Sequence, residues 1–78
     1  MRVLYFHTLR QATGCDEEPG PEELGDVSDL LAWAVTRHPS LGAHLSTILV
    51  ARNHEWVDRS APLSPGDEVA LMPPLSGG

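Results

Sequence analysis

Short apolar runs separated by turn residues predict a small sheet. Residues 2–7 (RVLYFH), 48–51 and 68–72 are rich in β-branched, aromatic and other apolar types and are too short for stable helices. Residues 55–57 form a further short run, and Asn53 before it tolerates the positive φ that a tight hairpin needs. The pattern therefore predicts a first strand, a later hairpin and a last strand.

Apolar positions at helical spacing predict one main helix that begins at Asp26. The carboxylate of Asp26 can accept hydrogen bonds from free N–H groups of the first turn, and Asp29 complements the helix dipole. The core-facing positions follow the i, i+3, i+4, i+7 spacing: Val27, Leu30, Leu31 and Ala34. Because Pro39 disfavours helical backbone at the residue before it, the helix is expected to end near His38.

Two stretches have weaker patterns. Residues 8–13 are expected to form a single helical turn, which Gly14 ends in the left-handed conformation. Residues 16–25 (DEEPGPEELG) contain two prolines, two glycines and five acids, which predicts a loop or a poor edge strand. The order of the elements is that of an α+β domain, with one helix packed on a small mixed sheet.

Length and charge restrict the classes of function. The chain has 78 residues, which is enough for one domain with a thin core, so a deep internal active site is not expected. Five basic residues, all of them Arg, stand against 11 acidic ones and give a net charge of −6, which disfavours nucleic acid as a partner and favours a basic protein surface. No apolar run approaches the length of a membrane span, and the lone Cys15 agrees with a reducing compartment, so a cytoplasmic location is expected.

No side chain is a convincing catalyst or metal ligand. The histidines, which are His7, His38, His44 and His54, have no i, i+4 pair and no cysteine or carboxylate in a ligand pattern with them. Three acids follow Cys15 directly and oppose formation of its thiolate, so it is not expected to be a nucleophile. We therefore expect no metal, no bound cofactor and no catalytic side chain.

The C-terminus is the remaining candidate site. Pro73 and Pro74 cannot donate to a sheet ladder, so residues 1–74 are expected to form the domain and residues 75–78 a tail. The tail is Leu75, Ser76, Gly77 and Gly78. Glycines without Cβ atoms leave the terminal carboxylate accessible and let the tail enter a narrow channel. A terminus that is merely flexible is the alternative on these grounds.

The quoted segments resemble the MoaD/ThiS-type sulfur carrier proteins, and more the molybdopterin branch than the thiamine branch. VLYFHTLRQATG is similar to the family's first strand and short helix, and DVSDLL to the start of its main helix. The most specific match is LSPGDEVALMPPLSGG, in which turn, last strand, proline pair and terminal glycines occur in family order. Two features depart from the family: residues 16–25 lack the alternation of its second strand, and Asp26 replaces the usual capping Thr.

The resemblance implies a ubiquitin-like β-grasp fold and a role as the non-catalytic small subunit of a molybdopterin synthase. An E1-like adenylyltransferase would activate Gly78 with ATP, and a sulfur donor protein would convert it to a thiocarboxylate. The tail from Pro73 to Gly77 would then enter the large synthase subunit, and the sulfur would pass to a pyranopterin precursor. Alternatives are a carrier for thiamine, cysteine or a secondary metabolite, a ubiquitin-like protein modifier, and an interaction domain with an inert tail.

Partner contacts outside the tail are expected from apolar residues near the last strand. Leu71, Leu75 and Trp56 are candidates, although each residue type is also common in cores, and for Trp56 we expect a core position.

Overall fold

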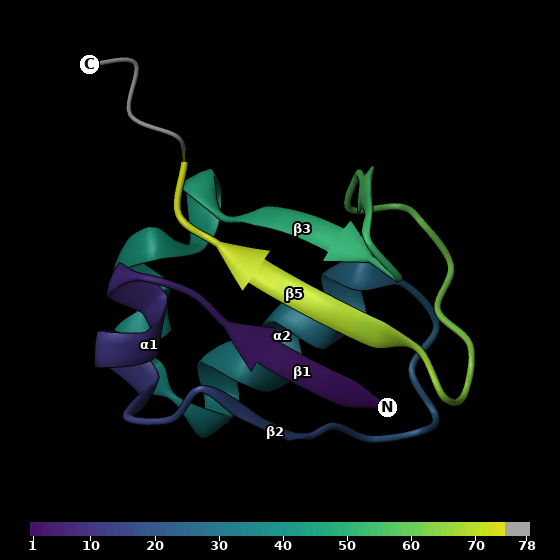
Figure 1. Ribbon diagram of the computed structural model, residues 1–78, viewed down its shortest axis with the longest axis horizontal. Helices are drawn as coiled ribbons and strands as arrows, with labels where there is room; N and C mark the ends of the chain where they lie inside the picture. Colours follow the sequence, from purple (N-terminus) through teal and green to yellow (C-terminus); the bar gives the residue numbers. More distant parts are fainter. Residues whose placement is uncertain (75–78) are drawn as a thin grey trace.

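The computed structural model describes residues 1–74, which form a sheet with helices (Figure 1). The strands are β1 (Arg2–Tyr5), β2 (Glu17–Pro19), β3 (Leu49–Arg52), β4 (Glu55–Val57) and β5 (Glu68–Met72). The helices are α1 (Thr8–Thr13), α2 (Val27–Arg37) and the 3₁₀ segment η1 (Pro39–Thr47). Each of the strands and helices expected from the sequence is present, and η1 fills the stretch for which no period was evident.

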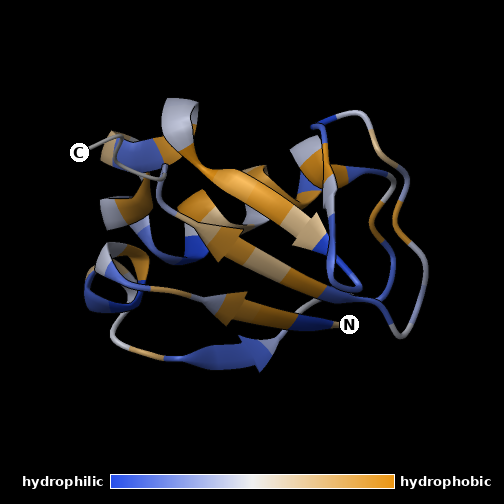
Figure 2. Ribbon diagram, turned by 45° about the horizontal axis from the view of Figure 1, so that its top comes forward, coloured by the Kyte–Doolittle hydropathy of each residue, from blue (hydrophilic) through white to orange (hydrophobic). Residues whose placement is uncertain are grey.

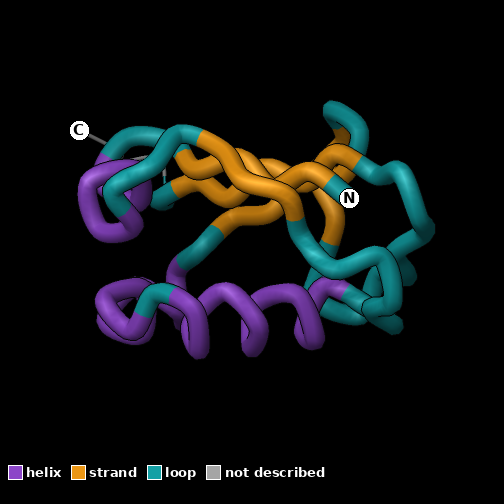
Figure 3. The backbone as a smooth tube through the Cα atoms, turned by 90° about the horizontal axis from the view of Figure 1, so that it is seen from below, coloured by secondary structure: helices purple, strands orange, loops and turns teal. Residues whose placement is uncertain are grey.

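The sheet is mixed, with strand order β2-β1-β5-β3-β4. The first and last strands of the chain lie side by side in the centre as a parallel pair, with Val3 opposite Val69. β2 pairs antiparallel with β1 at one edge, and the β3–β4 hairpin continues the sheet antiparallel from β5 at the other. Seen edge-on, α2 lies on one side of the sheet and α1 lies at its end (Figure 3).

The main helix begins and ends as its local sequence predicts. Asp26 accepts a hydrogen bond from the N–H of Asp29, and the Asp29 side chain accepts one from the N–H of Asp26, which completes a capping box. The helix ends at Arg37, immediately before His38 and Pro39. Its predicted apolar stripe is buried at all of its positions, which are Val27, Leu30, Leu31 and Ala34.

The helix end at Gly14 and the hairpin turn at Asn53 have the backbone conformations that the sequence predicts. Gly14 ends α1 in the left-handed conformation with φ of 77°, and its N–H donates to the carbonyl of Arg10. In the hairpin turn Asn53 and His54 both have positive φ, 50° and 72°, as a tight hairpin turn requires. The Asn53 amide donates to Asp67 and its Oδ1 accepts from the N–H of Glu68, so the turn is tied to the start of β5.

The core lies between α2 and the inner face of the sheet. Val3 and Tyr5 of β1, Val50 of β3, and Val69 and Leu71 of β5 all point into it. The sequence left two positions open for Leu71, a partner contact or the core; Leu71 has no exposed surface, so the core position is confirmed and the partner contact is wrong. Its position in the centre of the sheet, facing α2, explains this result.

The expected core position of Trp56 is also wrong, because 60% of its surface is exposed. Trp56 lies opposite Ala51 in the β3–β4 ladder, which places it on the face of the sheet away from α2.

The acidic segment does form an edge strand, β2, but this strand is only three residues long. The first strand ends at Tyr5, earlier than expected, because the chain turns at His7, where φ is 53°. Within residues 1–74 no helix is both long and apolar enough to cross a membrane.

Candidate docking face and tail root

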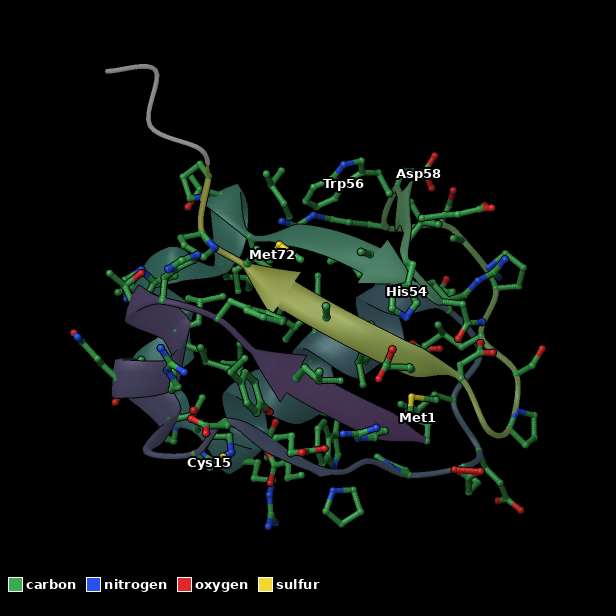
Figure 4. All side chains as sticks on the ribbon, viewed as in Figure 1. Met1, Cys15, His54, Trp56, Asp58 and Met72 are labelled. Carbon is green, nitrogen blue, oxygen red and sulfur yellow. The ribbon has the colours of Figure 1, made fainter. Side chains whose placement is uncertain are left out.

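The outer face of the sheet is apolar across its centre. Strand register places Leu4, Ala70, Ala51 and Trp56 side by side from β1 to β4. The same register puts Leu49 opposite Met72, one step nearer the end of β5. None of the helices in residues 1–74 covers this face, which is turned toward the viewer in Figure 4, with Trp56 and Met72 labelled on it. We call these residues, with Phe6, the outer face.

One hollow lies on the outer face and a second lies at the edge of the sheet formed by β3 and β4. The hollow on the outer face, of about 130 Å³, lies over the central strands, and its lining includes Leu4, Phe6, Met72 and His54. A broader groove of about 700 Å³ runs along the β3–β4 side and is lined by residues 46–50 and 56–59. Exposed apolar surface of this kind on a small domain is typical of a site for another protein.

The root of the tail lies at this groove. β5 ends at Met72, as the proline pair predicts, and Pro74 lines the groove together with Leu49 and Trp56. Pro73 and Pro74 therefore lead the chain out of the sheet beside its most exposed apolar side chains. The predicted tail residues Leu75, Ser76, Gly77 and Gly78 lie outside the described residues.

A row of charged side chains bounds the outer face at the end opposite the tail root. Arg2 pairs with Glu17 of β2, and its Nη1 lies 3.4 Å from Glu68 Oε1 of β5. His54 Nε2 lies 2.9 Å from the other oxygen of Glu68. The hydrogen bond between Arg2 and Glu17 raises the pKa of the guanidinium and lowers the pKa of the carboxyl. These pairs are exposed, so they contribute little to stability and instead mark where the apolar surface stops.

A second polar cluster lies on the inner side of the sheet, around Glu18 of β2. The Glu18 side chain is only 8% exposed. Its Oε2 accepts a hydrogen bond from Tyr5 Oη at 2.6 Å and lies 2.6 Å from His38 Nε2, while its Oε1 pairs with Arg37. Burial alone raises the pKa of Glu18, but hydrogen bonds from Tyr5, Arg37 and His38 outweigh it and hold that pKa below its usual range. Burial, and then the bond to Glu18, raise the pKa of the Tyr5 phenol.

This cluster contains metal-binding residue types that the sequence did not bring together. Possible ligand atoms of Cys15, Glu18 and His38 lie within 4.8 Å of one another. The Glu18 carboxylate already has three hydrogen-bond partners, which are Tyr5, Arg37 and His38. Because Arg37 is a cation, it balances the negative charge of the carboxylate without a metal ion. An ion would have to displace the contact between Glu18 and His38. Sequence spacing gave no signal here, because His38 lies 20 residues after Glu18 and only the fold brings it to Cys15 and Glu18.

The comparisons with known proteins identify the family. The sequence model of the ThiS family matches residues 3–78. The chain belongs to the ThiS family. The molybdopterin synthase sulfur carrier subunit of Chlamydomonas reinhardtii is 44% identical, over all of this chain and 98% of its own length.

Solved structures confirm the ubiquitin-like β-grasp fold. A putative molybdopterin converting factor subunit 1 from Pyrococcus furiosus is 30% identical, with a TM-score of 0.80 and 95% of each chain covered. The small archaeal modifier protein 1 of H. volcanii is 26% identical, with a TM-score of 0.77 and the same coverage. The family and fold implied by the resemblance of residues 63–78 and of the N-terminal segment are therefore confirmed.

Proposed function

We propose that this protein is the sulfur carrier subunit of a molybdopterin synthase and that Gly78 carries the sulfur. The observation that carries the proposal is the position of the tail root. Pro74 leaves the sheet at an open apolar groove that it shares with Leu49 and Trp56, so a partner bound there also meets the tail. The full-length similarity to a molybdopterin synthase sulfur carrier subunit supports the same role.

Activation of the tail requires chemistry that a carboxylate cannot perform alone. In the proposed reaction the Gly78 carboxylate attacks the α-phosphate of ATP on an E1-like enzyme, forming an acyl adenylate and releasing pyrophosphate. A persulfide sulfur of a donor protein then attacks the acyl carbon, the C–O bond to AMP breaks, and an acyl disulfide forms. A second thiol attacks the donor's cysteine sulfur, the S–S bond breaks with the thiocarboxylate as leaving group, and a disulfide remains on the donor side. ATP is consumed by the activating enzyme, and the carrier itself needs no bound cofactor.

The large synthase subunit is the proposed acceptor of the loaded tail. Contacts on the outer face supply binding energy that offsets the cost of ordering the tail in the partner's channel. The net charge of −6 steers association toward a basic surface and is consistent with a partner other than nucleic acid. Acid and base chemistry on the pyranopterin precursor is assigned to the large subunit, and the reaction is assigned to the cytoplasm because Cys15 is the only cysteine.

The proposal is tested by intact mass measurement after incubation with ATP, the activating enzyme and a sulfur source. Fragmentation must place any gain at Gly78, because oxidation of Met1, Met72 or Cys15 changes the mass by nearly the same amount. A chain lacking Gly78 is the matched control and should show no such product. An unchanged Gly78, under conditions that convert a known carrier, would contradict the proposal.

A ubiquitin-like modifier is the second candidate, favoured by the similarity to small archaeal modifier protein 1. The chain has no lysine, so it cannot form lysine-linked chains on itself, although it could be attached singly to a target. Immunoblots of native extract separate the two roles, since a modifier produces conjugates of higher mass. A carrier for another sulfur product is distinguished by which synthase subunit copurifies with the chain.

A further inference from the structure

β2 differs from the other strands in how it is held to the domain. Its inward-facing residue is Glu18, and the two neighbours Glu17 and Pro19 are exposed. The adjacent strand β1 and the central strand β5 instead bury apolar side chains, such as Val3 and Leu71. Figure 2 shows this contrast, with β2 coloured hydrophilic beside the mostly hydrophobic β1. The strand therefore has a carboxylate where the others have a hydrophobic anchor.

The groups that hold this carboxylate come from two other elements. Tyr5 belongs to β1, whereas Arg37 ends α2 and His38 is its C-cap. The rings of Tyr5 and His38 pack edge to face, with centroids 5.6 Å apart, so each helps to position the other around Glu18. The cluster thus joins the edge strand both to its neighbour in the sheet and to the end of the main helix.

Detachment of β2 breaks the contacts of Glu18 with Tyr5, Arg37 and His38 together. Glu18 would pass into water, where it is well solvated, but the buried hydroxyl of Tyr5 would lose its partner. Little apolar surface of β2 itself would be exposed, because neither Glu17 nor Pro19 is buried. The Arg2–Glu17 pair also crosses this edge, but it is exposed and contributes little. The side-chain cost of opening the edge is therefore concentrated in the buried cluster around Glu18, unlike the cost of separating β1 from β5.

We infer that Glu18 is a latch: β2 detaches from β1 as a local unit, and the contacts of Glu18 with Tyr5, Arg37 and His38 keep it closed. Cys15 lies in the segment that leads into β2 and is also next to this cluster. Its Sγ is within 4.8 Å of a carboxylate oxygen of Glu18 and a ring nitrogen of His38. Opening frees the paired edge of β1 while the core between α2 and the central strands persists. All of these contacts lie within the domain, so opening of β2 does not depend on whether the protein carries sulfur.

Hydrogen exchange of single amides, measured by NMR on the full chain, tests the latch. The N–H of Tyr5 donates to the carbonyl of Asp16, and the N–H of Gly20 donates to that of Met1, so both report on the β1–β2 edge. The N–H of Phe6 donates to the carbonyl of Leu71, so it reports on the opposite side of the same chain segment. Local opening accelerates exchange of the first two amides and not of the third.

The key variant is Glu18→Gln, and Glu17→Gln is its matched control on the same strand. We expect exchange at Tyr5 and Gly20 to become about tenfold faster in Glu18→Gln, since a charged hydrogen-bond partner is lost, and to remain near wild type in Glu17→Gln. Phe6 should exchange at an unchanged rate in both. Arg37→Gln, which removes one exposed partner of the carboxylate, should give a smaller increase at the same two amides if Glu18→Gln fails to fold.

Three outcomes would overturn the inference. Equal acceleration at Tyr5, Gly20 and Phe6 in Glu18→Gln or Arg37→Gln would mean that the cluster stabilises the whole fold and not one strand. Acceleration in Glu17→Gln as large as in Glu18→Gln would mean that any acid on β2 has the same effect. Unchanged exchange in both Glu18→Gln and Arg37→Gln would mean that the cluster does not hold the edge.

Discussion

Ala51 and Trp56 lie directly opposite each other in the β3–β4 ladder, and this pairing puts the indole on the face of the sheet away from α2 (Figure 4). Ala51 is small and nearly buried, so the large ring of Trp56 on the edge strand β4 can lie beside β3 and stay exposed. Trp56 is therefore accessible to a partner, and it lines the same groove as Pro74 at the root of the tail.

Replacement of Trp56 by Ala should weaken partner binding without unfolding the domain. The side chain is largely exposed, so the free energy of unfolding should fall by less than about 1 kcal/mol, whereas loss of a central aromatic contact should weaken binding at least about tenfold. Calorimetry with the large synthase subunit and urea unfolding measure the two effects. Gln11→Ala, on α1, is the control; equal binding by both variants would exclude the outer face as the docking site.

Leu71→Ala, in contrast to the Trp56 variant, should strongly lower the free energy of unfolding. Leu71 is fully buried between the sheet and α2, so the truncation should lower the free energy of unfolding by about 2–5 kcal/mol. Leu49→Ala removes the same atoms from a partly exposed position and should cost much less. Equal midpoints of urea unfolding for the two variants would contradict the assignment of inner and outer faces.

The capping box of α2 predicts a graded response at Asp26. Asp26→Ala removes the acceptor for the N–H of Asp29 and should lower the free energy of unfolding by about 1 kcal/mol. Asp26→Thr should retain most of this stability, because a hydroxyl can accept the same hydrogen bond. Guanidinium unfolding of the three proteins checks the order. A Thr variant as unstable as the Ala variant would show that the charge of Asp26, and not its capping bond, matters.

Asp67 should contribute stability that is lost in acid. A hydrogen bond from the N–H of Ser64, then one from Asn53, lower the pKa of the Asp67 carboxyl in the folded protein. Because the folded pKa lies below the unfolded one, the contribution is complete above the unfolded pKa of about 3.9 and disappears as pH falls through the folded pKa.

Urea unfolding at a series of pH values measures this contribution. Wild type should exceed Asp67→Asn in the free energy of unfolding at about pH 7, and the difference should shrink toward about pH 3 as the carboxylate is protonated. Asp16→Asn, at an exposed position, is the control for a change of net charge. A difference between wild type and Asp67→Asn that stays constant over this range would contradict the assignment.

The parts of the fold that were predicted correctly depend on local interactions. The left-handed Gly14, the Asp26 cap and the positive φ at Asn53 are each favoured by residues within a few positions along the chain. The proline pair likewise marks the end of β5 at Met72 without reference to the rest of the molecule. Of the candidate site, the sequence predicted the end of β5 and an apolar surface near the last strand, but not that Trp56 is part of this surface and Leu71 is not.

The sequence by itself determined the elements, their order, and the family to which its terminal motif belongs. Only the tertiary structure decided that Trp56 is exposed, that Leu71 is buried, and that Glu18 meets Tyr5, Arg37 and His38. The physical reason is that local signals set backbone conformation within a few residues. Which face of a strand is covered, and which distant side chains meet, depend instead on strand register and on the position of α2 across the sheet.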